Sequence, residues 1–340
     1  MKSIAIVGAG ISGCVVARKL AERGCRVTVF EANANPGGLA EDRKVEDAYI
    51  PLWGPHIFRT SNKQVYKFIN RFCKLSATTH RVRIYVDGSY VVFPPDSIKK
   101  PATMSIDYYA SLKDILIDIV GPQIYCKYYE EYTQKKLGVD ASYLAPQIIS
   151  LIPLFNHKGR YFSEIIEGIP EVGYVTLFQN MLDHKMISTV YNLFVAAREL
   201  HSFDYIIWSG RIDEYFDYCF GELFFASVRH EISQNWTWPI SEKEEAVINF
   251  PQTNVPYIRA TNYQALNSVP YIGLEYPLEG NLCAYPILTS KAVIKRNKYI
   301  EKAESIKDKV SFIGRQGRFE YSSMDRCVLN ALKLGISLKF

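Results

Sequence analysis

The chain has 340 residues, which excludes a mini-protein and favours either one large domain or two to three interleaved ones. Its 48% hydrophobic and 22% charged residues exclude global disorder, because this much apolar surface can offset the entropy lost on folding. The 40 basic and 35 acidic residues are interspersed, and a net charge of +5 suits binding of a small anion better than binding of nucleic acid.

The seven cysteines are scattered and include no CxxC pair, so neither a structural zinc site nor a disulfide framework is expected. The N-terminal apolar run is broken by three glycines and does not resemble a signal peptide. No window reaches the roughly 18 uncharged apolar residues that a membrane span needs. We therefore expect a reducing, cytoplasmic location, with no membrane span, no metal and no nucleic-acid partner.

The first predicted elements are a strand at 3–7, a helix at 11–21 and a second strand at 26–30. Strand, helix and strand within about 30 residues predict a parallel βαβ unit. A further helix is predicted at 61–72, where Ser61 and Gln64 have the spacing of a capping box.

Later segments alternate between strand-like and helical patterns. The segment 81–94 predicts a hairpin that turns at Asp87-Gly88, and 106–137 predicts two helices separated at Gly121-Pro122. A helix is predicted after the GIPEVGY segment, followed by a strand at 203–210 and an antiparallel sheet at 223–300. The last predicted elements are a strand at 310–314 and a helix at 325–336.

A glycine motif joins the first predicted strand to its helix. Gly8, Gly10 and Gly13 fit GxGxxG, in which glycines allow a tight turn and let backbone N–H groups approach a pyrophosphate. Glu31 ends the second predicted strand, where a carboxylate can accept a hydrogen bond from a ribose hydroxyl. The motif therefore predicts a bound dinucleotide rather than an ordinary glycine-rich turn.

A second glycine pair indicates which dinucleotide is bound. Gly37, Gly38 and Leu39 follow closely after Glu31 and allow a second backbone approach to a pyrophosphate, as flavoproteins of this fold often have. FAD is therefore favoured over NAD. The predicted fold class is α/β, a FAD-binding Rossmann-like domain with an inserted helical domain and an inserted antiparallel sheet domain. The expected bounds are 1–75, 185–222 and 308–340 for the first domain, 97–152 for the helical domain, and 76–96, 153–184 and 223–307 for the sheet domain.

A series of short motifs extends along the whole chain. In order they are GPHIF at 54–58, HRV at 80–82, Tyr132-Thr133, RYF at 160–162, GIP at 168–170, IDEYF at 212–216, PYIR at 256–259, Tyr285-Pro286 and Gly314-Arg315. In this order the chain resembles the UDP-galactopyranose mutases, from its first predicted strand to its last helix.

The resemblance implies a FAD enzyme, active when its flavin is reduced, that interconverts the pyranose and furanose forms of a nucleotide sugar without net redox change. In the family the flavin N5 bonds to the anomeric carbon and displaces the nucleotide diphosphate, the sugar ring opens and recloses, and the diphosphate returns. A homodimer is a further implication of the resemblance.

The resemblance also implies roles for individual residues. His56 would lie next to the flavin ring, and Arg259 and Arg315 would hold the diphosphate, so these three are the implied catalytic residues. The implied substrate-binding residues are Tyr128, Tyr132, Thr133, Asn249, Arg259, Tyr285 and Tyr321, with Tyr132 under the base. Glycine motifs and resemblance together give the cofactor-binding set Gly8, Gly10, Ser12, Gly13, Glu31, Gly37, Gly38, Leu39, His56, Gly314, Arg315 and Met324.

The chain departs from the usual family residues at several positions. Leu137 replaces a tryptophan, Ile165 replaces an arginine of a mobile loop, and Ser323 replaces an aspartate near the flavin. New cations that could compensate are Arg59, Arg211 and Arg318. We therefore hypothesise a divergent mutase acting on another nucleotide hexose, such as an N-acetylated or 6-deoxy sugar.

Three alternatives stay open. The chain could be a flavin oxidoreductase of the amine-oxidase or desaturase type, a mutase-fold enzyme that catalyses a different rearrangement of a nucleotide sugar, or a flavin-binding relative without turnover. The mutase is favoured, because Arg259 and Arg315 within their motifs suit an anionic substrate.

Overall fold

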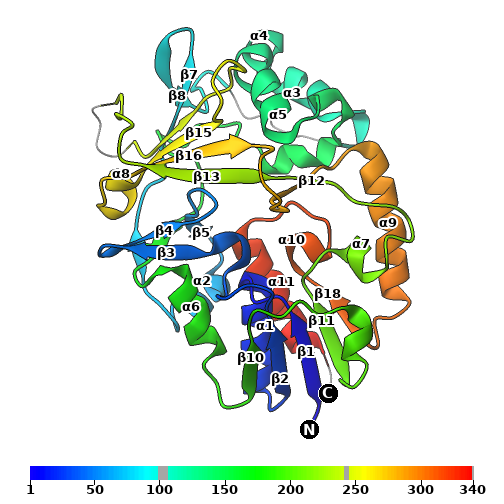
Figure 1. The fold of residues 1–340 in the computed structure, drawn as a ribbon. Coiled ribbons are helices and arrows are strands. Elements are labelled where there is room, and N and C mark those ends of the chain that lie inside the picture. The colour runs from blue at the N-terminus through cyan, green and yellow to red at the C-terminus, as the bar shows by residue number, and fades with distance from the viewer. Residues whose placement is uncertain (99–105, 241–244, 339–340) are drawn as a thin grey trace.

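Figure 1 presents the fold as a computed structural model, which describes residues 1–98, 106–240 and 245–338. Parts of all three expected domains, at 99–105, 241–244 and 339–340, lie outside the described residues. A parallel sheet and its helices form the lower half in this view, and a second, larger sheet lies above it under a group of helices.

The lower sheet has five parallel strands in the order β10, β2, β1, β11 and β18. The strands are β1 (Ser3–Val7), β2 (Arg26–Phe30), β10 (Ile187–Val190), β11 (Tyr205–Trp208) and β18 (Val310–Phe312). Segments from the start, middle and end of the chain thus meet in one sheet. This arrangement confirms the predicted Rossmann-like α/β fold and the βαβ unit at its start.

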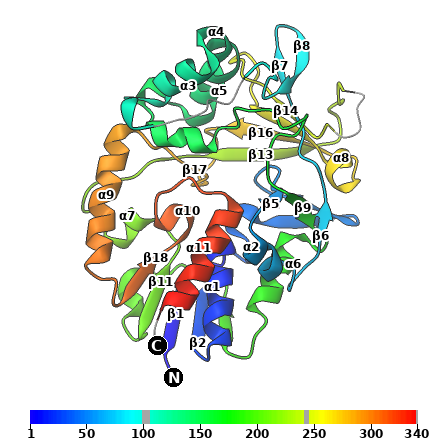
Figure 2. The ribbon, with the colours of Figure 1, turned by 180° about the vertical axis from the view of Figure 1, so that it is seen from behind.

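Four helices cover the parallel sheet: α1 (Ile11–Glu22), α6 (Gly173–Leu182), α9 (Ser290–Glu304) and α11 (Met324–Ser337). Successive strand residues point to opposite faces, so Ile4 and Ile6 pack with α1, α6 and α11, whereas Ala5 packs in the cluster that contains Tyr299 of α9. Seen from behind in Figure 2, α1 and α11 lie side by side across the sheet.

The upper sheet has six strands in the order β13, β16, β15, β14, β7 and β8. They are β7 (Val82–Val86), β8 (Ser89–Phe93), β13 (Val228–Ser233), β14 (Val247–Asn249), β15 (Arg259–Asn262) and β16 (Ile272–Pro277). All pairs are antiparallel except that of β14 with β7. The predicted hairpin is confirmed, with Asp87 and Gly88 both at positive φ between β7 and β8.

The helices above this sheet share one core with it. They are α3 (Leu112–Val120), α4 (Pro122–Tyr125) and α5 (Glu131–Leu137), with a π-helical segment at Cys126–Glu130 between the last two. Val82 and Ile84 of the sheet pack in the same cluster as Leu112 and Leu116 of α3. Within the described residues, no helix is both long enough and apolar enough to cross a membrane.

Smaller elements connect the two halves. Two strand pairs are β3 (Asp42–Val45) with β4 (Ala48–Pro51) and β12 (Phe225–Ala226) with β17 (Tyr285–Pro286). A three-stranded sheet contains β5 (Phe58–Thr60), β9 (Ile166–Pro170) and β6 (Leu75–Ala77). The remaining short helices are α2 (Lys63–Ile69), α7 (Ile212–Tyr215), α8 (Tyr263–Asn267) and α10 (Gly314–Gly317).

The structure differs from the expected elements in two places. Helix α9 lies in a region expected to be strand-like; its buried side is narrow, with only Tyr299 and Ala303 buried, so its apolar periodicity is weak. The cap of α2 is also different: the Asn62 side chain, not Ser61, accepts hydrogen bonds from the N–H groups of Gln64 and Val65.

The packing also bears on the expected domain bounds. Helices α6 and α9 lie within the ranges expected for the sheet domain, yet both pack against the five-stranded parallel sheet. We therefore propose that 173–182 and 290–304 belong with the first domain.

Candidate active site

The first glycine motif is built by close backbone approach. Gly8 follows β1 with φ +95°, a conformation that favours glycine, and α1 begins three residues later. A Cβ on Gly13 would lie 2.0 Å from the carbonyl oxygen of Gly8, so the third glycine allows α1 to pack tightly against the end of β1. Gly13 therefore allows the tight turn between β1 and α1, but it does not line the cavity that Gly8 and Gly10 line.

The second glycine pair lies directly against the first motif. The N–H of Gly37 donates to the carbonyl oxygen of Ala9 at 3.0 Å, and Gly10 and Gly37 form a β-bridge. The two loops thus form one surface of backbone groups, and a Cβ on Gly10 would meet nothing nearer than 4.0 Å. This surface is where a pyrophosphate can approach the backbone.

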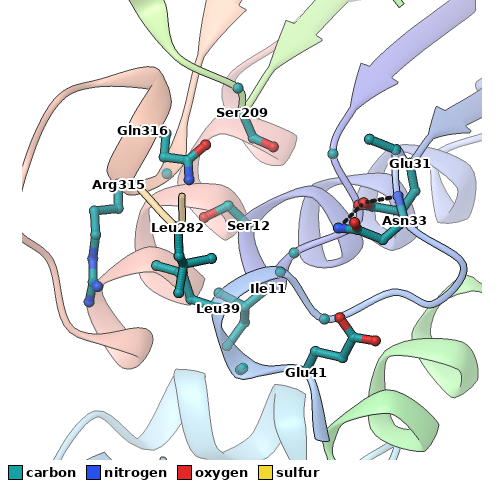
Figure 3. A pocket seen from close by; sticks show the side chains of 18 of the residues that line it. Ile11, Ser12, Glu31, Asn33, Leu39, Glu41, Ser209, Leu282, Arg315 and Gln316 are labelled. Carbon is teal, nitrogen blue, oxygen red and sulfur yellow. Dashed lines mark hydrogen bonds between the residues drawn. The ribbon is translucent and has the colours of Figure 1, made fainter. Parts of the chain in front are cut away.

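Glu31 connects the end of β2 to the glycine motif. Its Oε2 accepts from the N–H of Ala9 at 2.7 Å. Its Oε1 accepts from the backbone N–H and the side-chain amide of Asn33 at 2.9 and 3.0 Å (Figure 3). Glu31 is 5% exposed and lines the cavity beside the glycines. A carboxylate oxygen has two lone pairs, so Glu31 keeps the capacity to accept from a ribose hydroxyl.

These groups enclose the larger of two adjoining cavities, with a volume of about 700 Å³. That volume lies in the range for small-molecule and cofactor sites. The predicted cofactor residues that line it are Gly8, Gly10, Ser12, Glu31, Gly37, Gly38, Leu39, His56, Gly314, Arg315 and Met324. Sequence reasoning missed Phe194, which lines the same cavity although its side chain is 65% exposed.

The smaller cavity, of about 280 Å³, lies between α5 and the strands β14 and β15. Of the expected substrate residues, those that line it are Tyr132, Thr133, Asn249, Arg259, Tyr285 and Tyr321. Tyr128 does not line it; its ring lies 6.3 Å from that of Phe93 and packs at the edge of the helical core. The neighbouring helical residue Tyr129 lines the cavity instead.

The two cavities meet at a common wall formed by His56, Arg315, Ser322 and Met324. Nδ1 of His56 lies 2.8 Å from the carbonyl oxygen of Gly54 and must donate to it, which leaves the Nε2 lone pair as an acceptor. Burial, reinforced by the nearby charges of Arg315 and Arg259, lowers the pKa of His56 to about 4. The imidazole is therefore neutral near pH 7.

The two expected arginines are anchored differently. Arg259 is held by side chains: its Nε donates to Asn249 at 3.2 Å, its Nη1 to Glu275 at 3.2 Å and its Nη2 to the hydroxyl of Tyr132 at 3.1 Å. Arg315 is held by backbone, because its two Nη atoms donate to the carbonyl oxygens of Ala284 at 2.7 Å and Ser322 at 3.0 Å.

The smaller cavity is also lined by residues that were not among the expected site residues, among them His80, Lys136 and Arg59, the last noted only as a departure. Burial, reinforced by the charges of Arg259 and Arg59, lowers the pKa of His80 to about 3. The adjacent Lys135 instead donates to the carbonyl oxygens of Phe250, Gln252 and Tyr257 at 2.7–2.8 Å. No pattern in the sequence distinguishes the two lysines.

The departures from the family pattern separate into those near the smaller cavity and those away from it. Arg59, Leu137 and Ser323 line this cavity. The other departing positions lie elsewhere: Arg211 is paired with Asp213 and Glu222, Arg318 donates to Glu320, and the side chain of Ile165 is 80% exposed. Of the three cations proposed to compensate, only Arg59 reaches the smaller cavity.

Comparisons with known proteins agree with this geometry. The profile of UDP-galactopyranose mutases matches residues 127–321, and the profile of NAD(P)-binding Rossmann-like domains matches residues 6–72. A probable UDP-galactopyranose mutase from Klebsiella pneumoniae is 29% identical, over 98% of this chain and 93% of that protein. A dTDP-fucopyranose mutase from Escherichia coli is 26% identical, over 98% of this chain and 97% of that protein.

A crystal structure of a reduced UDP-galactopyranose mutase matches the fold with a TM-score of 0.79 at 16% identity, covering 100% of this chain and 97% of that one. Fold, adjoining cavities and matches together define an α/β enzyme of the isomerase class. The chain belongs to the UDP-galactopyranose mutase family, since the family profile covers more than half of it. This confirms the resemblance read from the motifs.

Proposed function

We propose that the protein is a flavin-dependent mutase that interconverts the pyranose and furanose forms of a nucleotide-diphosphate hexose without net redox change. The observation that carries this proposal is the common wall of the two cavities. The larger cavity has the glycine loops of a dinucleotide site, and the smaller one is lined by basic side chains. They meet at His56 and Arg315, so one end of a bound dinucleotide can face an anionic substrate.

FAD is the cofactor that we propose for the larger cavity. Its pyrophosphate would lie on the loops at Gly10 and Gly37, and its ribose near Glu31. The open space beside Gly10 supports this fit, because any side chain there would enter the cradle. When bound and reduced, FAD would supply a nucleophilic flavin nitrogen for the exchange at the anomeric carbon.

The protein's own residues would then position the substrate and stabilise charge. Arg315 and Arg259 would retain the departed diphosphate, and the surrounding tyrosine hydroxyls would donate to its oxygens. His56, neutral and fixed through its Nδ1–H, would offer Nε2 as an acceptor at the wall where cofactor and sugar meet. Tyr132, whose hydroxyl is fixed by Arg259, would pack against the base.

We propose a nucleotide hexose as the substrate, with either uracil or thymine as the base. The two similar proteins from Klebsiella pneumoniae and Escherichia coli are named for UDP-galactopyranose and dTDP-fucopyranose. Leu137, Arg59 and Ser323 alter the lining of the smaller cavity, which favours a substrate that differs from UDP-galactopyranose, such as an N-acetylated or 6-deoxy hexose. A homodimer stays a prediction, which sedimentation velocity would test.

The alternatives predict different chemistry. An amine-oxidase-type enzyme would share the glycine loops, but four basic side chains, Arg59, Lys136, Arg259 and Arg315, line the smaller cavity and disfavour an amine or apolar substrate. Such an enzyme would consume oxygen or another acceptor. A different rearrangement would give a product other than the furanose, and a non-catalytic relative would bind flavin without any exchange.

The test is to incubate the flavin-loaded protein, with and without dithionite, with a panel of UDP- and dTDP-hexoses and to separate the products by chromatography. We expect a yellow protein that converts at least one pyranose to its furanose only after reduction. Equal activity of the oxidised protein without reductant would contradict the flavin mechanism. Steady oxygen consumption with an amine substrate would instead support the oxidoreductase.

A further inference from the structure

Two of the four basic side chains in the smaller cavity already have acidic partners. Arg259 pairs with Glu275, which is 2% exposed, and Arg59 pairs with Glu164 while its guanidinium lies 3.7 Å over the ring of Phe162. Each of these pairs is close to neutral as a unit. Neither arginine therefore leaves a full positive charge for a ligand.

The other two basic side chains, Lys136 and Arg315, have no such partner. Within residues 1–98, 106–240 and 245–338, no ion pair joins either of them to a carboxylate. Among the residues that the structure describes, the guanidinium of Arg315 donates only to neutral carbonyl groups. The ammonium of Lys136 lies among the rings of Tyr285, Tyr132 and Tyr321 at 4.5, 5.9 and 6.0 Å.

Lys136 and Arg315 lie near the same pair of aromatic rings. The rings of Tyr285 and Tyr321 have centres 5.5 Å apart, and both line the cavity. The Arg315 guanidinium lies 4.9 Å from the Tyr321 ring and 5.8 Å from the Tyr285 ring. Both cations are thus within about 6 Å of both rings, and they converge on one region of the cavity from separate helices, α5 and α10.

This arrangement favours an anionic ligand. A buried positive charge without a partner is costly, and an anion placed between two such charges offsets that cost. The surroundings of Tyr321 agree with a cationic region: burial would raise the pKa of its phenol, but Lys136, Arg315 and Arg259 outweigh burial and lower it.

We propose that Lys136 acts with Arg315 as the clamp for the diphosphate of the substrate, while Arg259 is chiefly held by Glu275. The proposal rests on the proposed function for the identity of the ligand. Two uncompensated positive charges also match the two negative charges of a diphosphate that links a nucleoside to a neutral sugar. The substrate class is therefore a nucleotide sugar without an acidic group on its hexose.

The neighbouring lysine makes the assignment specific. Successive helix residues point in directions about 100° apart, so Lys135 and Lys136 cannot serve the same site. The ammonium of Lys135 uses three donors on backbone carbonyl oxygens and anchors α5 to the segment 250–257. Lys136, one residue further, is the side chain that enters the cavity.

The test measures binding of nucleoside diphosphates and nucleosides to the oxidised, FAD-loaded protein by titration calorimetry. UDP and dTDP are compared with uridine and thymidine, for the wild type and for Lys136→Met, Lys136→Gln and Lys136→Arg. The matched control is Lys127→Met, which removes an exposed lysine from the adjoining π-helical segment, where it pairs with Asp87. Flavin content and melting temperature identify any variant that is misfolded, and Lys136→Gln is the second variant if Lys136→Met is.

We expect both neutral variants to bind the nucleoside diphosphate about 10- to 100-fold more weakly, as for loss of one charge-assisted hydrogen bond, while nucleoside affinity stays within about twofold. Lys136→Arg should retain most of the affinity, and Lys127→Met all of it. Unchanged diphosphate affinity in the neutral variants, an equal loss for nucleosides, or a wild type that binds no nucleoside diphosphate would overturn the inference. A wild type that binds the diphosphate through Lys136 but isomerises no nucleotide sugar would contradict only the proposed function.

Discussion

The two cavities are built in different ways. At its glycine loops the larger one is formed by backbone: Gly8, Gly10 and Gly37 stand close together because their conformations and missing side chains allow it. The smaller one is formed by side chains from distant segments, such as Tyr132 on α5, Arg259 on β15 and Tyr321 near the end of the chain. Backbone cavities depend on a short local motif, whereas side-chain cavities depend on the whole fold and can change ligand by substitution.

The largest effect that we predict concerns the glycine loops. If it is not observed, the larger cavity does not depend on its glycines, and the contrast between the two cavities no longer holds. Gly13→Ala places a Cβ 2.0 Å from a backbone oxygen, so we expect little folded protein, with a loss of at least about 3 kcal/mol of unfolding free energy. Gly10→Ala has room at φ −73° and should fold normally, yet bind FAD at least about tenfold more weakly. Circular dichroism, denaturant unfolding and flavin titration measure these outcomes. Normal FAD affinity in Gly10→Ala would place the pyrophosphate elsewhere.

The next effect concerns the side-chain cavity. Arg259→Ala should lower turnover by at least about 100-fold, because the guanidinium that holds Asn249 and the Tyr132 hydroxyl in place beside the substrate is lost. It should also lower the unfolding free energy by about 3 kcal/mol, because Glu275 is left buried and unpaired. The double variant Arg259→Ala/Glu275→Gln should recover much of the stability but not the turnover. Recovery of turnover in the double variant would remove Arg259 from the reaction.

The smallest effect is a dependence of stability on pH that belongs to the side-chain cavity. Burial lowers the pKa of His56 to about 4 and that of His80 to about 3, below the usual 6.5. As the pH falls below 6.5, the unfolded chain binds protons that the folded chain does not, so stability is lost. For each of these two histidines, the free energy of unfolding should fall by about 1 kcal/mol between pH 6.5 and 5.5.

Denaturant unfolding at these two pH values checks the expectation. His80→Gln should remove its share of the pH dependence, whereas replacement of the exposed His201 should leave the dependence unchanged. The Nδ1 atom of His80 is buried without a hydrogen-bond partner within the described residues, so a glutamine loses no bond there. An unaltered slope in His80→Gln would show that this imidazole already gains its proton in the folded chain.

The parts of the fold that the sequence could predict are those fixed by local pattern. The βαβ unit and the hairpin at Asp87-Gly88 follow from periodicity and turn chemistry within a few residues. Helix α9 could not be recognised in the same way, because its narrow buried side gives weak periodicity. A clue was present: Thr289 accepts from the N–H of Ala292, and threonine is a favoured residue for starting a helix.

The residues of the candidate site also divide into those that a local pattern could predict and those that it could not. Glu31 and the glycines were identifiable from spacing alone, whereas Arg259 and Arg315 came only from the resemblance. Lys136 was not found, because two adjacent lysines on a helix look alike until the fold directs one to backbone carbonyls and the other into a cavity. Tyr128 was expected to contact the substrate because it lies one helical turn before Tyr132. The fold instead directs its ring against the helical core.

The strand order of the parallel sheet has a consequence for biosynthesis. Strand β1 pairs with β11, and α1 packs on α11, so β1 and α1 are synthesised well before partners that lie more than 200 positions later in the chain. Until residues 324–337 have emerged, the apolar side of α1 that faces α11 stays uncovered. A nascent chain of this protein therefore exposes this apolar surface to chaperones until α11 has been synthesised.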